Sequence, residues 1–157
     1  MAHEGIRSAV ARYEGPLTGY AARILGDAEK ARDVVQEAFL RLCAQDVSKL
    51  EGHLGEWLFT VCRNLALDQR RREKRMGPLQ VQDVEAGTRA PDPSAAEEGR
   101  MALAALGRLG EGQREVLRLK FQNGLSYREI ARVTGQSVSN VGFLMHEGLK
   151  ALRRELA

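Results

Sequence analysis

Apolar residues recur at three- and four-residue steps through two long stretches of this chain, and the pattern stops between residues 76 and 98. That interval is rich in Pro, Gly, Ala and acidic residues, which is typical of a linker. Only 5% of the 157 residues are aromatic, so Leu, Val, Ile and Ala must form the core, which favours helices. We therefore predict an all-α protein with two small helical domains, residues 1–75 and 99–157, joined by a flexible linker at 76–98.

The first predicted domain is a bundle of three or four helices. Residues 6–26 have a helical pattern, and Pro16 is expected to interrupt them and begin a second helix, because proline is tolerated in a helix's first turn. Asp27 then caps a helix that ends where a polar loop, 46–53, begins. A further helix covers about 54–75. Its expected buried stripe is Leu54, Trp57, Leu58, Val61, Leu65 and either Ala66 or Leu67.

The second predicted domain contains four helices. One begins at about residue 99, and the next is closed by Gly124. Ser126 is expected to cap a short third helix, and Ser137 a fourth that runs towards Leu156. The apolar side chains expected to line the first two of these helices are Met101, Leu103, Leu106, Leu109, Val116, Leu117, Leu119 and Phe121.

Residues 127–146 carry the pattern of a helix-turn-helix, with an ordinary helical hairpin as the alternative. Such a motif needs a small residue where its helices touch and a turn residue that accepts a left-handed backbone, and Ala131 and Gly135 meet these needs. The helix beginning at Ser126 could hold a phosphate on its N-terminal N–H groups. The apolar residues expected to hold the second helix in place are Ile130, Val138, Val141 and Met145. The candidates to face the major groove are Gln136, Ser137, Ser139, Asn140, Gly142, Phe143 and His146.

Charge is unevenly distributed along the chain. Residues 1–75 carry a net charge of +2, residues 76–99 of −4 and residues 100–157 of +5, which together give +3. Two basic parts around an acidic strip suit two nucleic-acid-facing domains and a solvated connector. The 54–75 helix ends in cations that could bind phosphates, or could simply form a solvated helix end favoured by the helix dipole. They are Arg63, Arg70, Arg71, Arg72, Lys74 and Arg75.

Cysteine and histidine usage gives no sign of a metal site or a catalytic centre. Cys43 and Cys62 form no CxxC pair and are expected to be reduced, buried thiols, with a redox switch as the alternative. His3, His53 and His146 have no partners at useful spacing. No apolar segment of the sequence approaches the roughly 18 residues of a membrane span. We expect a cytoplasmic protein with no metal, no cofactor and no enzymatic activity.

Three segments resemble, in order, the motifs of extracytoplasmic-function (ECF) sigma factors of bacterial RNA polymerase. Residues 27–42 resemble the polymerase-binding helix of that family, 57–71 its promoter-melting helix, and 113–131 part of its second DNA-binding domain. The resemblance implies a region 2-like bundle and a region 4-like helix-turn-helix domain. It also implies a protein that directs RNA polymerase to specific promoters and melts them. The implied partners are core RNA polymerase, promoter DNA and, as a further option, an anti-sigma factor.

The resemblance also implies roles for individual residues. The polymerase clamp would bind Asp33, Gln36, Glu37, Phe39 and Arg41. The minus-ten element would be opened and held by the 47–53 loop and by His53, Trp57, Arg63, Asn64, Asp68, Arg70 and Arg71. Trp57 could stack on a base there, or could belong to the core. The minus-thirty-five element would be bound by Ser126, Tyr127, Arg128, Gln136, Ser137, Ser139, Asn140, Phe143 and His146.

The second helix of the helix-turn-helix departs from the family pattern. Where relatives usually carry basic residues, this chain has Gly142, Phe143, Leu144 and Glu147, so phosphate contacts are lost. Phe143 and Leu144 could contact thymine methyls, form an apolar patch for a protein partner, or pack partly under the helix. Two alternatives to a sigma factor stay open. One is a helix-turn-helix regulator that acts without polymerase, and the other is an interaction module for polymerase or an anti-sigma factor with weakened minus-thirty-five recognition.

Overall fold

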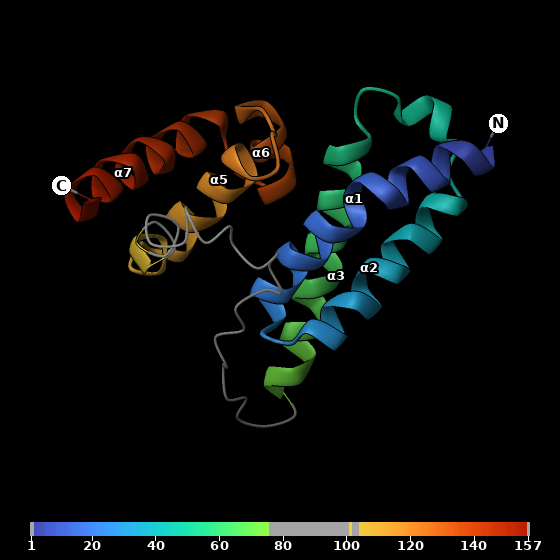
Figure 1. Ribbon diagram of the computed structural model, residues 1–157, viewed down its shortest axis with the longest axis horizontal. Coiled ribbons are helices and arrows are strands. Elements are labelled where there is room, and N and C mark those ends of the chain that lie inside the picture. Colours follow the sequence, from blue (N-terminus) through green and yellow to red (C-terminus); the bar gives the residue numbers. More distant parts are fainter. Residues whose placement is uncertain (1, 76–100, 102–103, 157) are drawn as a thin grey trace. The chain divides into compact units, whose positions relative to one another are not determined.

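The computed structural model describes residues 2–75, 101 and 104–156, and the regular elements of these residues are all helices (Figure 1). The helices fall into two compact units, one within 2–75 and one within 104–156, and each is described by itself. The predicted all-α fold with two small helical domains is confirmed. The predicted linker at 76–98 lies outside the described residues. None of the described helices combines the length and the apolarity needed to cross a bilayer.

The first unit consists of α1 (Ala2–Leu25), α2 (Ala28–Cys43), a short 3₁₀ helix η1 (Val47–Leu50) and α3 (Leu54–Arg75). α1 packs against both α2 and α3 (Figure 1). Leu17, Leu42 and Leu58 are fully buried between the three helices, and the ring of Tyr20 meets that of Phe59 edge-on with 5.4 Å between centroids. The outer faces of α2 and α3 point away from this core.

α1 runs without interruption through Pro16, so the predicted break at this residue was wrong. A proline inside a helix removes one hydrogen bond and crowds the preceding turn, which costs about 3 kcal/mol. Pro16 lies on the exposed side of α1, where water can bind the carbonyl that loses its partner. The neighbouring Leu17 and Tyr20 are buried against the rest of the unit. Burial of that face outweighs the local cost.

The turn between α1 and α2 is fixed by the capping residues that the sequence indicates. Gly26 has a φ of +71°, which ends α1 in a left-handed conformation. The carboxylate of Asp27 accepts hydrogen bonds of 2.8 and 3.1 Å from two backbone N–H groups in the first turn of α2. After α2 ends at Cys43, the segment predicted as a loop contains η1, which begins at a cap formed by Asp46, so the loop prediction was incomplete.

The bounds of α3 match the prediction, but its buried stripe differs from the expected one. The fully buried residues include Phe59 and Cys62, whereas Trp57 is only half-buried. Because both α1 and α2 pack against α3, the covered side is wider than a stripe drawn from hydrophobicity alone. Burial raises the pKa of the Cys62 thiol to about 12. Cys43 is exposed, so the prediction of two buried thiols holds for one of them.

The second unit consists of a short helical turn at 104–107, α5 (Glu111–Phe121), α6 (Tyr127–Thr134) and α7 (Val138–Leu156). α7 packs against both α5 and α6 (Figure 1). α5 and α7 approach closely at Gly148, where an added Cβ would lie 2.9 Å from Cδ1 of Leu117. The largest fully buried side chains of this unit are Val116, Leu119, Ile130, Val141 and Met145.

The predicted frame of the helix-turn-helix is confirmed. Ser126 and Glu129 form a reciprocal capping box at the start of α6, and Gly135 ends that helix with a φ of +70°. The hydroxyl of Ser137 accepts a 3.0 Å hydrogen bond from the backbone N–H of Asn140, which caps α7. Ala131 is buried, as a helix–helix contact requires.

Some side chains predicted to be buried in this unit lie on its surface instead. Val138, expected to hold the second helix in place, is 47% exposed, and Phe121 is 66% exposed. Val138 is the first residue of α7 and Phe121 the last of α5, so each lies at a helix end where fewer side chains surround it. Met101 is also exposed, and Leu103 lies outside the described residues.

Candidate nucleic-acid and protein interfaces

The outer face of α2 brings together most of the residues predicted to bind polymerase. Asp33, Gln36 and Glu37 are exposed and lie on one side of the helix, because residues three and four apart share a face. Arg41 lies at the edge of this face, and its Nε is 3.3 Å from Oε1 of Glu37. Phe39 is half-buried on the flank, so it is separated from the rest of the predicted set.

Leu40 belongs to the same face of α2, although it was not among the predicted residues. It follows Asp33, Gln36 and Glu37 at helical spacing, and it is 65% exposed. An exposed leucine among charged and amide side chains is a common composition for the centre of a protein–protein contact. The spacing 33, 36, 37 and 40 was the signal that could have identified it.

The residues predicted to act on the minus-ten element divide into two groups on α3. Trp57, Asn64 and Arg71 lie opposite the buried face and continue the line that begins at His53. Asp68 lies beside Arg71, with 3.5 Å between its Oδ1 and Nη1 of the arginine. The other two predicted residues, Arg63 and Arg70, are half-buried and seven residues apart, so they share a different flank of the helix.

His53 is held against the first turn of α3. Its carbonyl accepts a 2.9 Å hydrogen bond from the N–H of Trp57, and its own N–H donates to the carbonyl of Leu50 at 2.8 Å. Its Nδ1 lies 3.6 Å from Oε2 of the buried Glu56. The loop therefore presents His53 in line with the outer face of α3. Within the described residues, no group of three or more His, Cys, Asp or Glu side chains gathers in a way that could hold a metal ion.

An ion pair that was not predicted from the sequence ties the basic end of α3 to α2. Nζ of Lys30 lies 2.6 Å from Oε1 of Glu73, and the amide of Gln69 donates to the same oxygen at 3.4 Å. The hydrogen bond to Glu73 raises the pKa of Lys30. The cationic run of α3 is thus held in place beside the helix that carries the predicted polymerase-binding face.

The exposed face of α7 carries Ser139, Asn140, Phe143 and His146. The side-chain amide of Asn140 donates to Oε1 of Gln136, so these two amides act as a pair. Phe143 is 61% exposed. Leu144, in contrast, is half-buried and lies beside Gly112 of α5, where an added Cβ would be 3.6 Å from its Cδ1. Leu144 therefore packs within the unit, and Phe143 remains on the surface.

The start of α6 supplies further polar groups beside this face. The capping box occupies the Ser126 side chain and backbone N–H, with hydrogen bonds of 2.9 and 3.1 Å to and from Glu129. Tyr127 and Arg128 are exposed in the first turn. Nζ of Lys120, from α5, lies 5.5 Å from the centre of the Tyr127 ring, so a cation and an aromatic ring occur together there.

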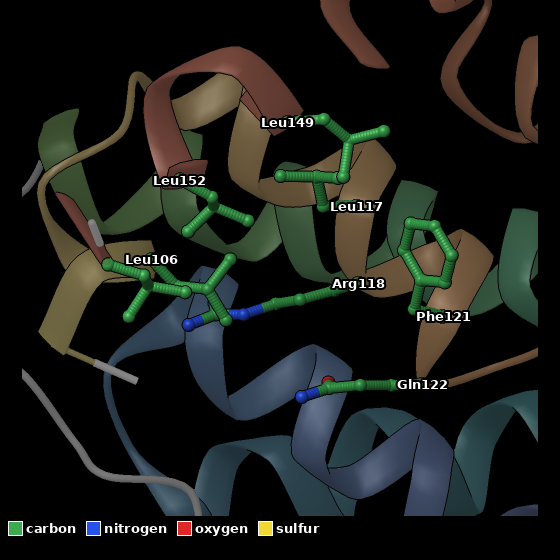
Figure 2. A pocket seen from close by; sticks show the side chains of 8 residues that line it. Leu106, Leu117, Arg118, Phe121, Gln122, Leu149 and Leu152 are labelled. Atoms are coloured by element: carbon green, nitrogen blue, oxygen red, sulfur yellow. The ribbon is translucent and has the colours of Figure 1, made fainter. Parts of the chain in front are cut away.

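An apolar groove of about 280 Å³ lies between α5 and the C-terminal half of α7 (Figure 2). Phe121, which the sequence pattern assigned to the core, is one of its walls. The groove was not predicted, because hydrophobic periodicity alone does not tell whether a side chain is covered. It is lined by Leu106, Leu117, Arg118, Phe121, Gln122, Leu149, Leu152 and Leu156.

Comparison with protein families gives two matches, in the order in which the two units follow along the chain. Residues 9–76 match the model of Sigma-70 region 2, and residues 99–152 match that of Sigma-70, region 4. The first match spans the α2 and α3 faces, and the second spans the helix-turn-helix and most of the groove.

Individual proteins show the same relationship. ECF RNA polymerase sigma factor SigL of Mycobacterium tuberculosis is 34% identical over 89% of this chain and 82% of its own length. ECF RNA polymerase sigma factor EcfG of Rhodopseudomonas palustris is 35% identical over 80% of this chain and 70% of its own length. The solved structure of the sigma factor RpoE from Bartonella quintana, in complex with the anti-sigma factor NepR, has the same fold. It has a TM-score of 0.70 and 22% identity, and the match covers 96% of this chain and 95% of that one.

Proposed function

The chain belongs to the ECF sigma factors of bacterial RNA polymerase, and on that premise we propose which of its residues bind polymerase and which bind promoter DNA. A sigma factor directs core polymerase to specific promoters, and the two ordered sigma-70 matches are the observation that carries this function. A helix-turn-helix regulator acting without polymerase is not favoured, because such a protein has no need of region 2. We assign residues 1–75 to polymerase and minus-ten binding, 76–98 to a linker, and 99–157 to the helix-turn-helix domain.

In this proposal, the outer face of α2 binds core polymerase. Asp33, Gln36 and Glu37 supply polar contacts, Leu40 supplies the apolar centre, and Arg41 completes the edge. Phe39 acts mainly through packing, since it is half-buried on the flank. Charged residues around a central apolar side chain favour fast, oriented association.

The outer face of α3 opens and holds the minus-ten element. Asn64 and Arg71, in line with His53 and Trp57, face the separated strand, while Asp68 orients Arg71. The half-buried Trp57 keeps part of its ring available for stacking on an unpaired base. Arg63 and Arg70, on the flank, bind phosphates at the edge of the opened duplex.

The helix-turn-helix binds the minus-thirty-five element. α7 enters the major groove with Ser139, Asn140, Phe143 and His146 towards the bases, and Gln136 joins them from the turn before this helix. Ser137 serves as the cap that positions this helix. Tyr127 and Arg128, at the start of α6, contact the DNA backbone, and the role of Ser126 is to fix that helix start through its capping box.

We further propose that the apolar groove of the second unit binds an anti-sigma factor. Its leucine walls and the exposed Phe121 suit an amphipathic helix. A solved structure of the same fold, the Bartonella quintana sigma factor, is a complex with an anti-sigma factor. We place the protein in the cytoplasm, where the polymerase acts, and assign it no cofactor, no metal and no catalysis of its own.

Run-off transcription tests the whole proposal. Purified full-length chain is mixed with core polymerase and a library of random duplexes, and transcripts are sequenced. We expect transcripts that share two upstream elements.

Gln36→Ala combined with Glu37→Ala should weaken binding to core polymerase. Asn64→Ala combined with Arg71→Ala should leave that binding intact but reduce strand opening, measured by permanganate reactivity and restored on a pre-opened template. Arg7→Ala, an exposed change on α1, is the control. No transcript from any duplex would overturn the sigma assignment.

A further inference from the structure

Phe143 is an isolated apolar side chain on a polar surface. It is 61% exposed on a face of α7 whose other members are Ser139, Asn140 and His146. Its neighbour Leu144 does not extend this surface, because it packs beside Gly112. A protein-binding surface usually needs a contiguous apolar patch, and the second unit has one in the groove between α5 and α7 rather than around Phe143.

Asn140 lies one helical turn before Phe143, and its pair with Gln136 has a defined hydrogen-bonding capacity. Because Asn140 donates to Oε1 of Gln136, the amide nitrogen of Gln136 keeps its donors and Oδ1 of Asn140 keeps its acceptor capacity. A donor and an acceptor side by side match the N7 acceptor and N6 donor that adenine presents in the major groove. The hydrogen bond between the two amides also reduces the number of rotamers that must be fixed on binding.

The spacing of these groups fits neighbouring base pairs. Asn140 and Phe143 are three residues apart on the same face of α7, which separates them by about 4.5 Å along the helix axis. Base pairs of DNA are stacked about 3.4 Å apart. The one apolar feature of the major-groove edges is the C5-methyl group of thymine. An aromatic ring beside an adenine-binding amide pair therefore has a natural contact in the thymine of the same or the next base pair.

We propose that α7 recognises an A·T-containing step of the minus-thirty-five element, with the Gln136–Asn140 pair on adenine N7 and N6 and the Phe143 ring on an adjacent thymine methyl. This inference rests on the proposed promoter-binding function and adds the identity of the bases. It also accounts for the absence of cations from this part of α7. Between Val138 and Leu149 there is no Lys or Arg, so base contacts carry a larger share of discrimination there.

Modified bases test the two contacts separately. Polymerase holoenzyme made with the full chain is assayed on a promoter obtained from the random library, with each thymine of the upstream element replaced in turn by deoxyuridine, which removes only the methyl group. We expect about fourfold weaker binding at one or two positions, the effect of one buried methyl. In Phe143→Ala, the same deoxyuridine replacements should not weaken binding further. In Phe143→Met, they should still weaken binding, but less than in the unaltered chain. Replacing adenines by 7-deazaadenine, which removes only N7, should weaken binding at a neighbouring position, and this effect should vanish in Gln136→Ala, which lacks the amide that donates to N7. Met101→Ala, another exposed apolar side chain, should respond like the unaltered chain.

The outcomes separate this inference from the proposed function. The methyl contact would be overturned if transcription proceeds normally but, at every thymine, deoxyuridine either has no effect or has the same effect in Phe143→Ala as in the unaltered chain. That outcome would leave the sigma function intact. If Phe143→Ala weakens transcription equally on every template, the residue binds a protein instead, and the proposal is wrong. If the unaltered chain yields no transcript at all, including from templates pre-opened at the minus-ten element, the proposed function itself fails.

Discussion

The outer faces of α3 and α7 are both candidates for DNA contact, but their chemistry differs. Five of the six residues at 70–75, the end of α3, are Lys or Arg, whereas the α7 segment from Val138 to Leu149 has none. Attraction of cations to phosphates is strong, independent of sequence and weakened by salt, while contacts to base edges are weaker individually but selective. One domain can therefore supply most of the affinity for DNA and the other most of the discrimination between DNA sequences.

The largest effect is expected from a substitution that destabilises the second unit and leaves the first unit intact. Gly148→Val should destabilise the second unit by about 1–3 kcal/mol, because the first carbon added would lie 2.9 Å from Cδ1 of Leu117. Hydrogen exchange should show faster exchange in α5, α6 and α7 and unchanged protection in α1, α2 and α3. Gly142→Ala is the matched control on the same helix. Its Cβ would meet nothing within 4 Å, so that change should stabilise the unit by about 0.5–1 kcal/mol. Equal loss of protection in both units would show that they do not fold independently.

The next effect tests whether the first unit holds the polymerase through α2. Leu40→Asp should weaken binding to core polymerase about tenfold or more, because a carboxylate without a partner would have to be desolvated at the apolar centre of the proposed interface. The side chain is 65% exposed, so the fold should not change. Affinity for core polymerase is measured by fluorescence anisotropy, and circular dichroism checks that the fold is unchanged. Leu40→Met should bind nearly normally, and an unaltered affinity in Leu40→Asp would remove this residue from the interface.

Local interactions explain why much of this architecture could be predicted from the sequence. Asp27, Ser126 and Ser137 cap their helices through hydrogen bonds to residues two or three positions away, and Gly26 and Gly135 adopt the left-handed conformation that glycine favours. These features depend on a few neighbouring residues only. The candidate residues of α2 were implied by the resemblance to sigma factors, and those of α7 followed from the helix-turn-helix pattern.

What the sequence could not provide depends on packing between helices. Pro16 is tolerated because the opposite side of α1 is covered by two other helices. Phe121 and Val138 are apolar and in register, yet at their helix ends they stay 66% and 47% exposed, and the groove beside Phe121 arises only when α5 and α7 meet. Leu144 was left open between three roles, and its contact with Gly112 is a tertiary fact. Periodicity indicates which face is apolar, but the partner helix determines how much of it is buried.

A charge change on α7 would reduce the difference between the two proposed DNA-binding surfaces. Glu147→Lys places a cation where this chain has an acid, so it should add about one phosphate contact and steepen the salt dependence of DNA binding by about one unit of slope. Between about 50 and 200 mM salt, the variant should therefore lose about three- to fourfold more affinity than the unaltered chain. Glu14→Lys, the same charge change on α1, controls for net charge. An identical salt slope in the Glu147 variant would place this position away from the DNA backbone.

The smallest expected effect concerns the Lys30–Glu73 pair, which holds the cationic end of α3 beside α2. Glu73→Gln should modestly lower the stability of the first unit and speed exchange in the last turn of α3, because the 2.6 Å contact loses its charge. The pKa of Lys30 is raised by the hydrogen bond to Glu73, so the stability that the pair contributes is fully present below the ordinary lysine pKa. That contribution is lost as the pH rises through the raised value. The difference in melting temperature between the unaltered chain and Lys30→Met, followed from neutral pH to about pH 11, should therefore shrink at the alkaline end. If the difference in melting temperature stays constant with pH, the effect comes from packing of the lysine stem. Recovery of the melting temperature in the double variant Lys30→Glu with Glu73→Lys would confirm that charge is responsible.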